Sequence, residues 1–264
     1  AQGERLTLRE LVTDPARIPA ADNFFSAPPF DTLLMRRAPP GTGTGVNTNA
    51  MNALKRLHLP PSSSLAKRGK DVPREALVPL SQWAHAFRTA LSNQALPKHR
   101  STGLPEYATP PSGASDGTYV LAALAPAEPL VNSLCEASRR PQSVFPIAYE
   151  DGFNALLPHL TYLKSFNNLL DVRIAAKLSL GDTAGAWSDL ECSWRVSQVV
   201  ATEPLLISQL VRYAQVQIVL NSLRRGLVIH AWNDAQLRSL QQQLEQPNYF
   251  AGMRSEERRV GKEC

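Results

Sequence analysis

Prolines divide the chain into two regions that require different kinds of structure. The 264 residues contain 21 prolines, yet only Pro158 and Pro204 lie between residues 154 and 246. A proline inside a helix removes a backbone hydrogen bond and clashes with the preceding turn, but the first helical turn tolerates it. The stretch 154–246 can therefore hold long helices, whereas the proline-rich part before it holds only short ones.

Three runs of apolar residues at helical spacing fill the proline-poor stretch. They cover residues 158–180, 183–200 and 205–227, and each is long enough for a helix of roughly 30 Å. Gly181 and Asp182 are typical of a helix stop followed by a helix cap. Connections of a few residues make consecutive helices antiparallel. The sequence thus predicts an all-α fold built from an antiparallel bundle of long helices.

The third run, residues 205–227, differs from the other two because its apolar residues occupy two neighbouring faces. Leu206, Leu210 and Leu220 lie on one face, and Ile207 and Ile218 lie on the next. An apolar surface this wide is typical of a helix that is buried on two sides. We therefore expect this helix to be the central one of the bundle.

The first region reads as a wrapping for that bundle. Residues 1–116 are predicted to be loop-dominated, with one or two short helices at 51–59 and 80–96, and residues 117–253 form the helical domain. The segment 14–40 is rich in proline but also in large hydrophobic residues, which a disordered linker would lack. We expect it to lie extended over the helices with its phenylalanines in surface grooves: Phe24, Phe25 and Phe30.

Both ends of the sequence carry information about its origin. Residues 254–264 match the translation of a common sequencing adapter at every position. We expect this tail to be a library artefact and the natural C-terminus to be different. The sequence starts with Ala1 rather than Met, so we also expect an upstream piece, which could hold a signal or membrane anchor.

Charge and cysteine content limit the partners. The net charge of +5 arises mainly in the first 116 residues, and its densest part is a Pro/Ser-rich loop at 55–74 without aromatic side chains. A nucleic-acid surface would combine basic and aromatic residues on a defined element, so no nucleic-acid partner is predicted. Cys135 and Cys192 lack metal-ligand spacing. One disulfide stays open as an alternative, but two separately buried thiols are favoured. No cofactor or metal is expected.

Two resemblances add to this interpretation. Ala176, Leu180-Gly181-Asp182, Ala186 and Leu190 resemble one tetratricopeptide hairpin, although only one copy is visible. Helix pairs of that kind form grooves for peptides or proteins.

The second resemblance covers most of the chain. Its stretches are Gly3–Leu6, Pro19–Phe24, Phe145-Pro146, Tyr149–Gly152, Leu156–His159, Leu180–Asp182, Glu203–Arg212 and His230–Leu237. Together they are similar to a family of bacterial, often membrane-anchored helical proteins of unknown function. The resemblance implies an exported domain on the periplasmic side of the inner membrane, held through an N-terminal segment outside this sequence.

Polar residues near the predicted helix ends are the only candidates for catalysis. In an antiparallel bundle, Glu150 and His159 would lie near Glu203. A carboxylate and an imidazole at one end could act as acid and base. No hydrolase or metalloprotease motif accompanies them, and purely structural roles are the favoured alternative. An envelope hydrolase would require these side chains to converge in an open pocket.

The favoured hypothesis is a non-enzymatic interaction or scaffold module of the cell envelope. Trp187 and Trp194, seven residues apart on one helix face, and the phenylalanines of 14–40 could border a groove for a protein or peptide partner. Core packing is the default role for such tryptophans. The sequence supports an architecture and a compartment but no named reaction.

Overall fold

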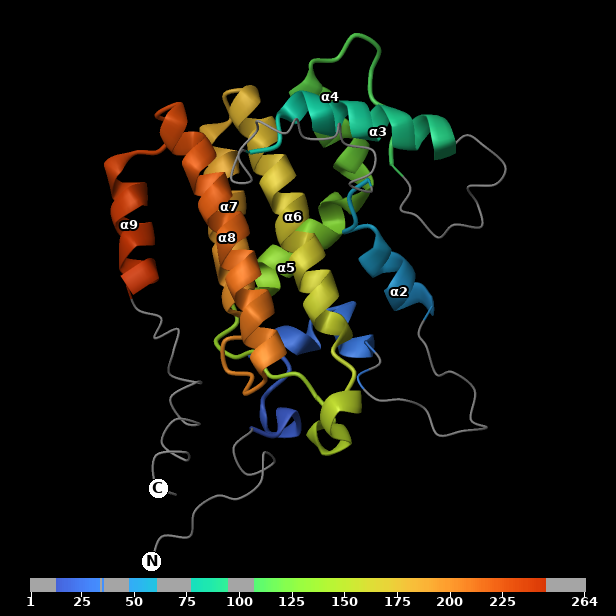
Figure 1. Cartoon of the computed structure of the whole chain (residues 1–264), viewed down its shortest axis with the longest axis vertical. Coiled ribbons are helices and arrows are strands. Elements are labelled where there is room, and N and C mark those ends of the chain that lie inside the picture. The colour runs from blue at the N-terminus through green and yellow to red at the C-terminus, as the bar shows by residue number, and fades with distance from the viewer. Residues whose placement is uncertain (1–12, 34, 36–47, 61–76, 95–106, 246–264) are drawn as a thin grey trace, which may run out of the picture.

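The computed structural model describes residues 13–33, 35, 48–60, 77–94 and 107–245. These ranges contain eight α-helices and several short 3-10 turns (Figure 1). None of the helices in the described ranges is long and apolar enough to cross a membrane. The all-α fold class is confirmed.

Three long helices form the centre, as the apolar spacing predicted. They are α6 (Pro158–Ser179), α7 (Thr183–Gln198) and α8 (Leu206–Val228). Short turns reverse the chain twice, so α7 is antiparallel to α6 and α8, and α6 and α8 run parallel (Figure 1). The antiparallel bundle is therefore confirmed, whereas the tetratricopeptide character of the α6–α7 hairpin stays a prediction.

Shorter helices surround this centre. Four of them precede it: α2 (Thr48–Lys55), α3 (Leu80–Gln94), α4 (Asp116–Leu124) and α5 (Glu128–Ala137). Helix α4 packs against α6, α3 contacts both α4 and α6, and α5 contacts α7. The last described helix, α9 (Asp234–Glu245), lies beside the upper half of α8 in Figure 1.

The N-terminal wrapping is less extended than expected. Three 3-10 turns interrupt it, namely η1 (Pro15–Arg17), η2 (Phe24–Ser26) and η3 (Phe30–Thr32). The buried side chain of Asn23 holds the wrapping in place, because its Nδ2 donates to the Val144 carbonyl at 3.0 Å and its Oδ1 accepts from the Val144 N–H at 2.9 Å. The rest of the predicted wrapping, residues 36–40, lies outside the described residues.

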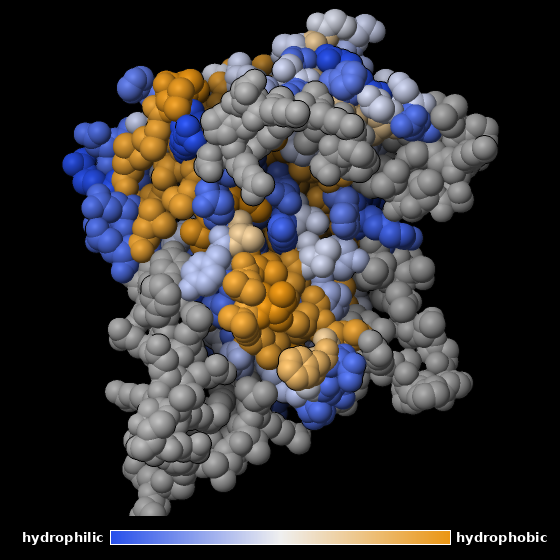
Figure 2. Space-filling model, viewed as in Figure 1, coloured by the Kyte–Doolittle hydropathy of each residue, from blue (hydrophilic) through white to orange (hydrophobic). Residues whose placement is uncertain are grey.

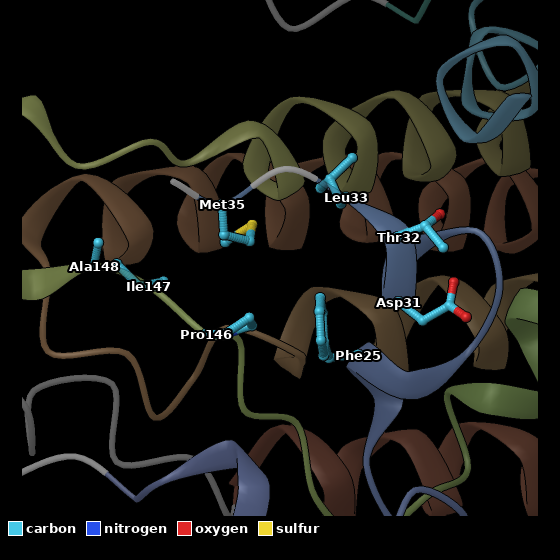
Figure 3. Close-up of a pocket in the computed structure, with 8 residues that line it drawn as sticks. All are labelled: Phe25, Asp31, Thr32, Leu33, Met35, Pro146, Ile147 and Ala148. Atoms are coloured by element: carbon cyan, nitrogen blue, oxygen red, sulfur yellow. The ribbon is translucent and has the colours of Figure 1, made fainter. Parts of the chain in front are cut away.

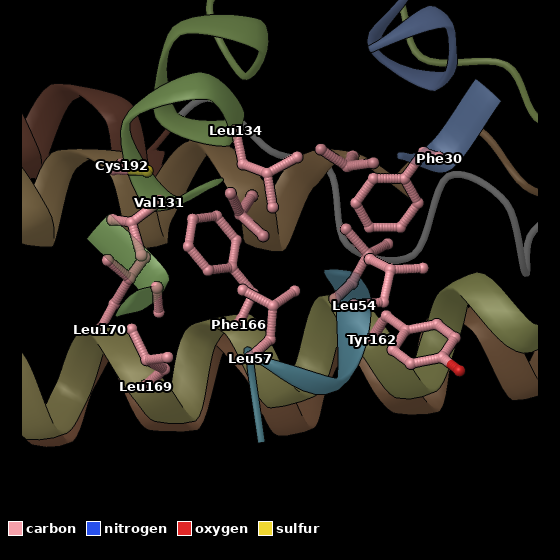
Figure 4. Packing of buried hydrophobic residues seen from close by; sticks show 14 of the residues in the cluster. Phe30, Leu54, Leu57, Val131, Leu134, Tyr162, Phe166, Leu169, Leu170 and Cys192 are labelled. Atoms are coloured by element: carbon pink, nitrogen blue, oxygen red, sulfur yellow. The ribbon is translucent and has the colours of Figure 1, made fainter. Parts of the chain in front are cut away.

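Two hydrophobic clusters stabilise the fold. The larger one joins the wrapping, α2 and α3 to α6, with Phe30, Leu54 and Phe166 fully buried (Figure 4). It therefore includes residues on both sides of the boundary expected at residue 116. The smaller cluster lies between α7, α8 and α9 and is centred on Trp187 and Trp232, whose rings meet edge to face at 5.3 Å.

Candidate functional site

A buried polar cluster lies where α6 and α8 begin. His159, in the first turn of α6, places Nε2 2.9 Å from Oε1 of Glu203. The other oxygen of this carboxylate accepts a hydrogen bond from the Ser208 hydroxyl in α8. The ring of Phe145 stacks on the imidazole with 4.2 Å between centroids. His159 is fully buried and Glu203 is 6% exposed, so both side chains are closed off from solvent.

The remaining catalytic candidate lies apart from this cluster. Glu150 belongs to the turn η7 (Tyr149–Asn154) and is exposed. Its neighbour Tyr149 is close enough to the cluster for the charge of Glu203 to affect its pKa. Burial is the larger cause and the negative charge of Glu203 the smaller one, and both raise the pKa of the Tyr149 hydroxyl. The structure thus brings His159 and Glu203 together in the core and leaves Glu150 at the surface.

This arrangement ties helices together rather than presenting groups to a substrate. A buried carboxylate requires hydrogen-bond donors, and the cluster supplies two from different elements. The imidazole Nδ1 is buried without a hydrogen-bond partner. If Nε2 carries the proton and donates to Glu203, Nδ1 is the bare acceptor nitrogen, which is the less costly group to leave unpaired. The favoured alternative of structural roles therefore accounts for the geometry.

Two of the stretches that carry the family resemblance, Pro19–Phe24 and Phe145-Pro146, meet beside this cluster. Phe24 lies 5.4 Å from Phe30 and 6.4 Å from Phe145 between ring centroids, and Phe145 covers His159. Sequence reasoning included Phe145 and Ser208 only in the stretches of the family resemblance and gave neither residue a role in a site. The available signals were that Phe145 is an apolar residue between two prolines and that Ser208 is a serine five positions after Glu203. Neither signal indicates a site until the packing of the helices is known.

Helix α8 is bound to the bundle by polar contacts. Its seven buried residues are Ser208, Gln209, Arg212, Gln215, Val219, Ser222 and Gly226, with one aliphatic side chain among them. The Gln215 amide accepts from Asn167 of α6 at 2.7 Å, and the Ser222 hydroxyl donates to Asp171 of α6 at 2.7 Å. Because these polar residues recur every three or four positions, they form one continuous seam along the helix.

Several apolar residues of α8 consequently face outward, although Val219 is buried and Val211, Val216 and Leu223 pack against the hydrophobic clusters. Leu206 is 63% exposed, Leu210 53% and Ile207 49%. Figure 2 shows them as an apolar patch over the lower half of α8. The prediction that this helix is buried on two sides is wrong, because its buried face is the polar one. We call the exposed apolar residues of α8 the outer face: Leu206, Ile207, Leu210, Leu220, Leu227 and Val228.

The tryptophans of α7 do not border a groove. Trp187 and Trp194 are 8% and 4% exposed and belong to the smaller hydrophobic cluster. Trp187 packs against Trp232, and α9 covers this side of the bundle through Leu240. The structure therefore assigns both tryptophans the default role of core packing.

Of the three phenylalanines in the wrapping, one reaches a hollow. Phe24 and Phe30 are buried in the core, which corrects the expectation that they occupy surface grooves. Phe25 is partly exposed and lines an open hollow of about 540 Å³, together with residues 31–33, 35 and 146–148 (Figure 3). Asp31 and Thr32 also line it, so the hollow is mixed in polarity and holds one carboxylate.

The two cysteines that precede the tail at 254–264 form a disulfide. Cys135 of α5 and Cys192 of α7 are bonded, with their Cα atoms 5.3 Å apart. The prediction of two separate thiols is wrong because the packing of α5 on α7 brings together positions 57 residues apart. Sequence spacing carries no information on that distance.

A buried guanidinium supports the same side of the bundle. Arg173 of α6 is 4% exposed, and its Nε donates to Asp189 of α7 at 3.1 Å while its terminal nitrogens donate to Glu128 at the start of α5. The hydrogen bond from Arg173 lowers the pKa of Glu128. This network links three helices, and sequence reasoning did not identify it.

Comparison with known proteins adds no assignment. No protein-family model, no curated protein and no solved structure matches the chain. In the ranges that the structure describes, no group of three or more histidine, cysteine, aspartate or glutamate side chains could hold a metal ion. The family resemblance stays a prediction.

Proposed function

We propose that this protein is a non-enzymatic helical interaction module of the bacterial cell envelope, exported from the cytoplasm, that binds a protein partner. The observation that carries the proposal is the outer face of α8. Apolar residues that are 38–70% exposed line this helix, and most of its buried residues are polar (Figure 2). Contiguous apolar patches of this kind mark interaction sites in folded proteins.

The polar seam argues against the explanation that the apolar face is exposed because α8 is poorly packed. Side-chain hydrogen bonds fix α8 to α7 through Arg212 and to α6 through Gln215 and Ser222. A rotation of α8 that buried its leucines would break these bonds and leave their groups unpaired in the core, which costs about 1–3 kcal/mol for each group. The fold therefore holds the apolar face outward.

The disulfide supports the proposed compartment. Disulfides persist in oxidising compartments such as the periplasm and are rare in the cytosol. The bond between Cys135 and Cys192 joins two helices of the core, so it fits a protein that folds after export. The hydrolase alternative has no comparable support, since the carboxylate and imidazole that meet are both buried.

Site-specific photo-crosslinking tests the function. A photoreactive residue at position 206 in the protein in its native host should give a defined adduct, and one at position 180 should not. Leu180 is a matched control, because it is also exposed (46%) but lies at the turn after α6. Equal labelling from both positions, or none from position 206, would remove the basis of the proposal. In the same cells, Cys135 and Cys192 should react with a maleimide only after reduction.

A further inference from the structure

We propose that the outer face of α8 is a two-fold interface between copies of this chain, in which two α8 helices pack antiparallel about Gln217. This inference rests on the proposed function and names its partner. Nine large hydrophobic residues are exposed in the described part of the chain. Six form the outer face, Ile229 follows it directly, and Phe153 lies in η7 at the end where α8 begins. Leu180 is the one that lies elsewhere.

The spacing along α8 is self-complementary. The buried seam runs through positions 208, 212, 215, 219, 222 and 226, so the opposite side of the helix runs through 206, 210, 217, 221, 224 and 228. Gln217 is exposed in the middle of that side, eleven residues from both Leu206 and Val228. An antiparallel copy centred on Gln217 brings Leu206 against the second copy's Val228 and Ile207 against its Leu227. Leu220 meets Ala214, and only Leu210 lies against a charged residue, Arg224.

The charges favour the same orientation. The exposed carboxylates of Glu150 and Asp151 flank Phe153 at the end where α8 begins, and Arg224 is exposed near the end where α8 finishes. Antiparallel packing brings the Arg224 of each copy toward the acidic end of the other. Parallel packing would place like charges together. A closed two-fold interface uses one patch twice, so this single face is sufficient.

A polar residue on the axis gives the interface a register. The Gln217 amide hydrogen-bonds its neighbour Asn221 on the same helix at 3.3 Å. In the antiparallel pair, each Gln217 amide can instead bond the other across the axis. A polar residue within a helix interface fixes register at some cost in affinity, and Asn221 and Arg224 lie on the same side of α8 as Gln217. A lone helix pair buries less than the roughly 1,600 Å² of a standard interface, so a reversible dimer is expected.

Sedimentation velocity on the full chain from micromolar to several hundred micromolar tests the dimer, with Cys264→Ser to prevent adventitious bonds. A monomer–dimer equilibrium is expected. Ile207→Glu should weaken it at least tenfold, and Leu180→Glu should leave it unchanged. Both positions are exposed, so the fold tolerates either change, and circular dichroism checks this. Monomer at every concentration overturns the proposal. If the protein instead floats with lipid vesicles and Ile207→Glu abolishes that flotation, the face binds a membrane, and the dimer is equally refuted.

Cysteine cross-linking distinguishes the orientation. Gln217→Cys should form a disulfide-linked dimer under mild oxidation, because position 217 meets itself on the axis. Arg224→Cys should not, since its counterpart is position 210 and its own copy lies about 21 Å along the helix, beyond the Cα separation that a disulfide spans. Linkage of both variants, or of neither, overturns the antiparallel interface. A monomer whose position 206 cross-links to a different protein would refute the dimer and leave the proposed function intact.

Discussion

Helix propensity predicts that Gly226→Ala stabilises the protein, whereas the contact between Gly226 and Trp232 predicts that this substitution destabilises it. Gly226 lies in the last turn of α8, and a Cβ placed there would be 2.0 Å from Cε2 and 2.2 Å from Cζ2 of Trp232. That indole is 7% exposed, donates from Nε1 to the Leu223 carbonyl at 2.9 Å and packs against Trp187. It has little freedom to move.

The magnitude follows from two opposing effects. Alanine is favoured over glycine inside a helix by about 1 kcal/mol. Overpacking a buried site costs about 1–3 kcal/mol, and expelling an indole costs more. With a Cβ this far inside the contact distance, the upper part of that range applies. We expect Gly226→Ala to lower the free energy of unfolding by about 2 kcal/mol, measured by urea denaturation with far-UV circular dichroism.

A second background isolates the contact. Trp232→Leu removes the indole atoms that a Cβ at position 226 would meet, so Gly226→Ala should stabilise that variant by up to about 1 kcal/mol. The coupling between the two sites is then about 3 kcal/mol. If Gly226→Ala has the same effect in both backgrounds, or stabilises the original protein, the packing of Trp232 on α8 is wrong.

Three further predictions concern the links between helices. Replacing Cys135 and Cys192 by serine should cost about 4 kcal/mol of unfolding free energy, from the loop that the bond closes; a melting temperature equal to that of the oxidised protein would contradict it. Glu203→Leu should cost about 3 kcal/mol because it leaves a buried imidazole and hydroxyl without their acceptor, whereas an unchanged urea midpoint would refute the buried cluster. Since Arg173 lowers the pKa of Glu128 in the folded state, this carboxylate stabilises the protein above its ordinary pKa of 4.5 and less as the pH falls below it. The stability difference between the original protein and Glu128→Gln should therefore be constant at neutral pH and shrink below pH 4.5; a difference that grows on acidification would reverse the assignment.

The local features of the chain could be derived without coordinates. The proline-poor stretch predicted α6, α7 and α8 within a few residues of their ends. Gly181 takes the left-handed conformation at φ 77°, and the Asp182 carboxylate accepts from the Gly185 N–H at 2.8 Å. Asn233 and Gln236 form a capping box, with both hydrogen bonds at 2.9 Å. These features depend on residues close in sequence, which is why spacing reveals them.

Local reasoning failed for α8 because it assumed that apolar residues are buried. The helix is apolar around most of its circumference, so its sequence does not say which face turns inward. That choice depends on Asn167 and Asp171 of α6, which offer hydrogen bonds to Gln215 and Ser222. Polar partners on another helix decided the orientation, and the apolar outer face is the consequence.

In the candidate site, too, the sequence predicted some features and the packing of the helices decided others. The sequence indicated that His159 and Glu203 would lie at one end of an antiparallel bundle, and they do. Their closure from solvent depends on Phe145, which reaches the imidazole only because Asn23 holds the adjoining segment. Periodicity and capping determined which segments are helical. Hydrogen-bond partners distant in the sequence decided which faces are buried, since burying a polar group is favourable only where such a partner exists.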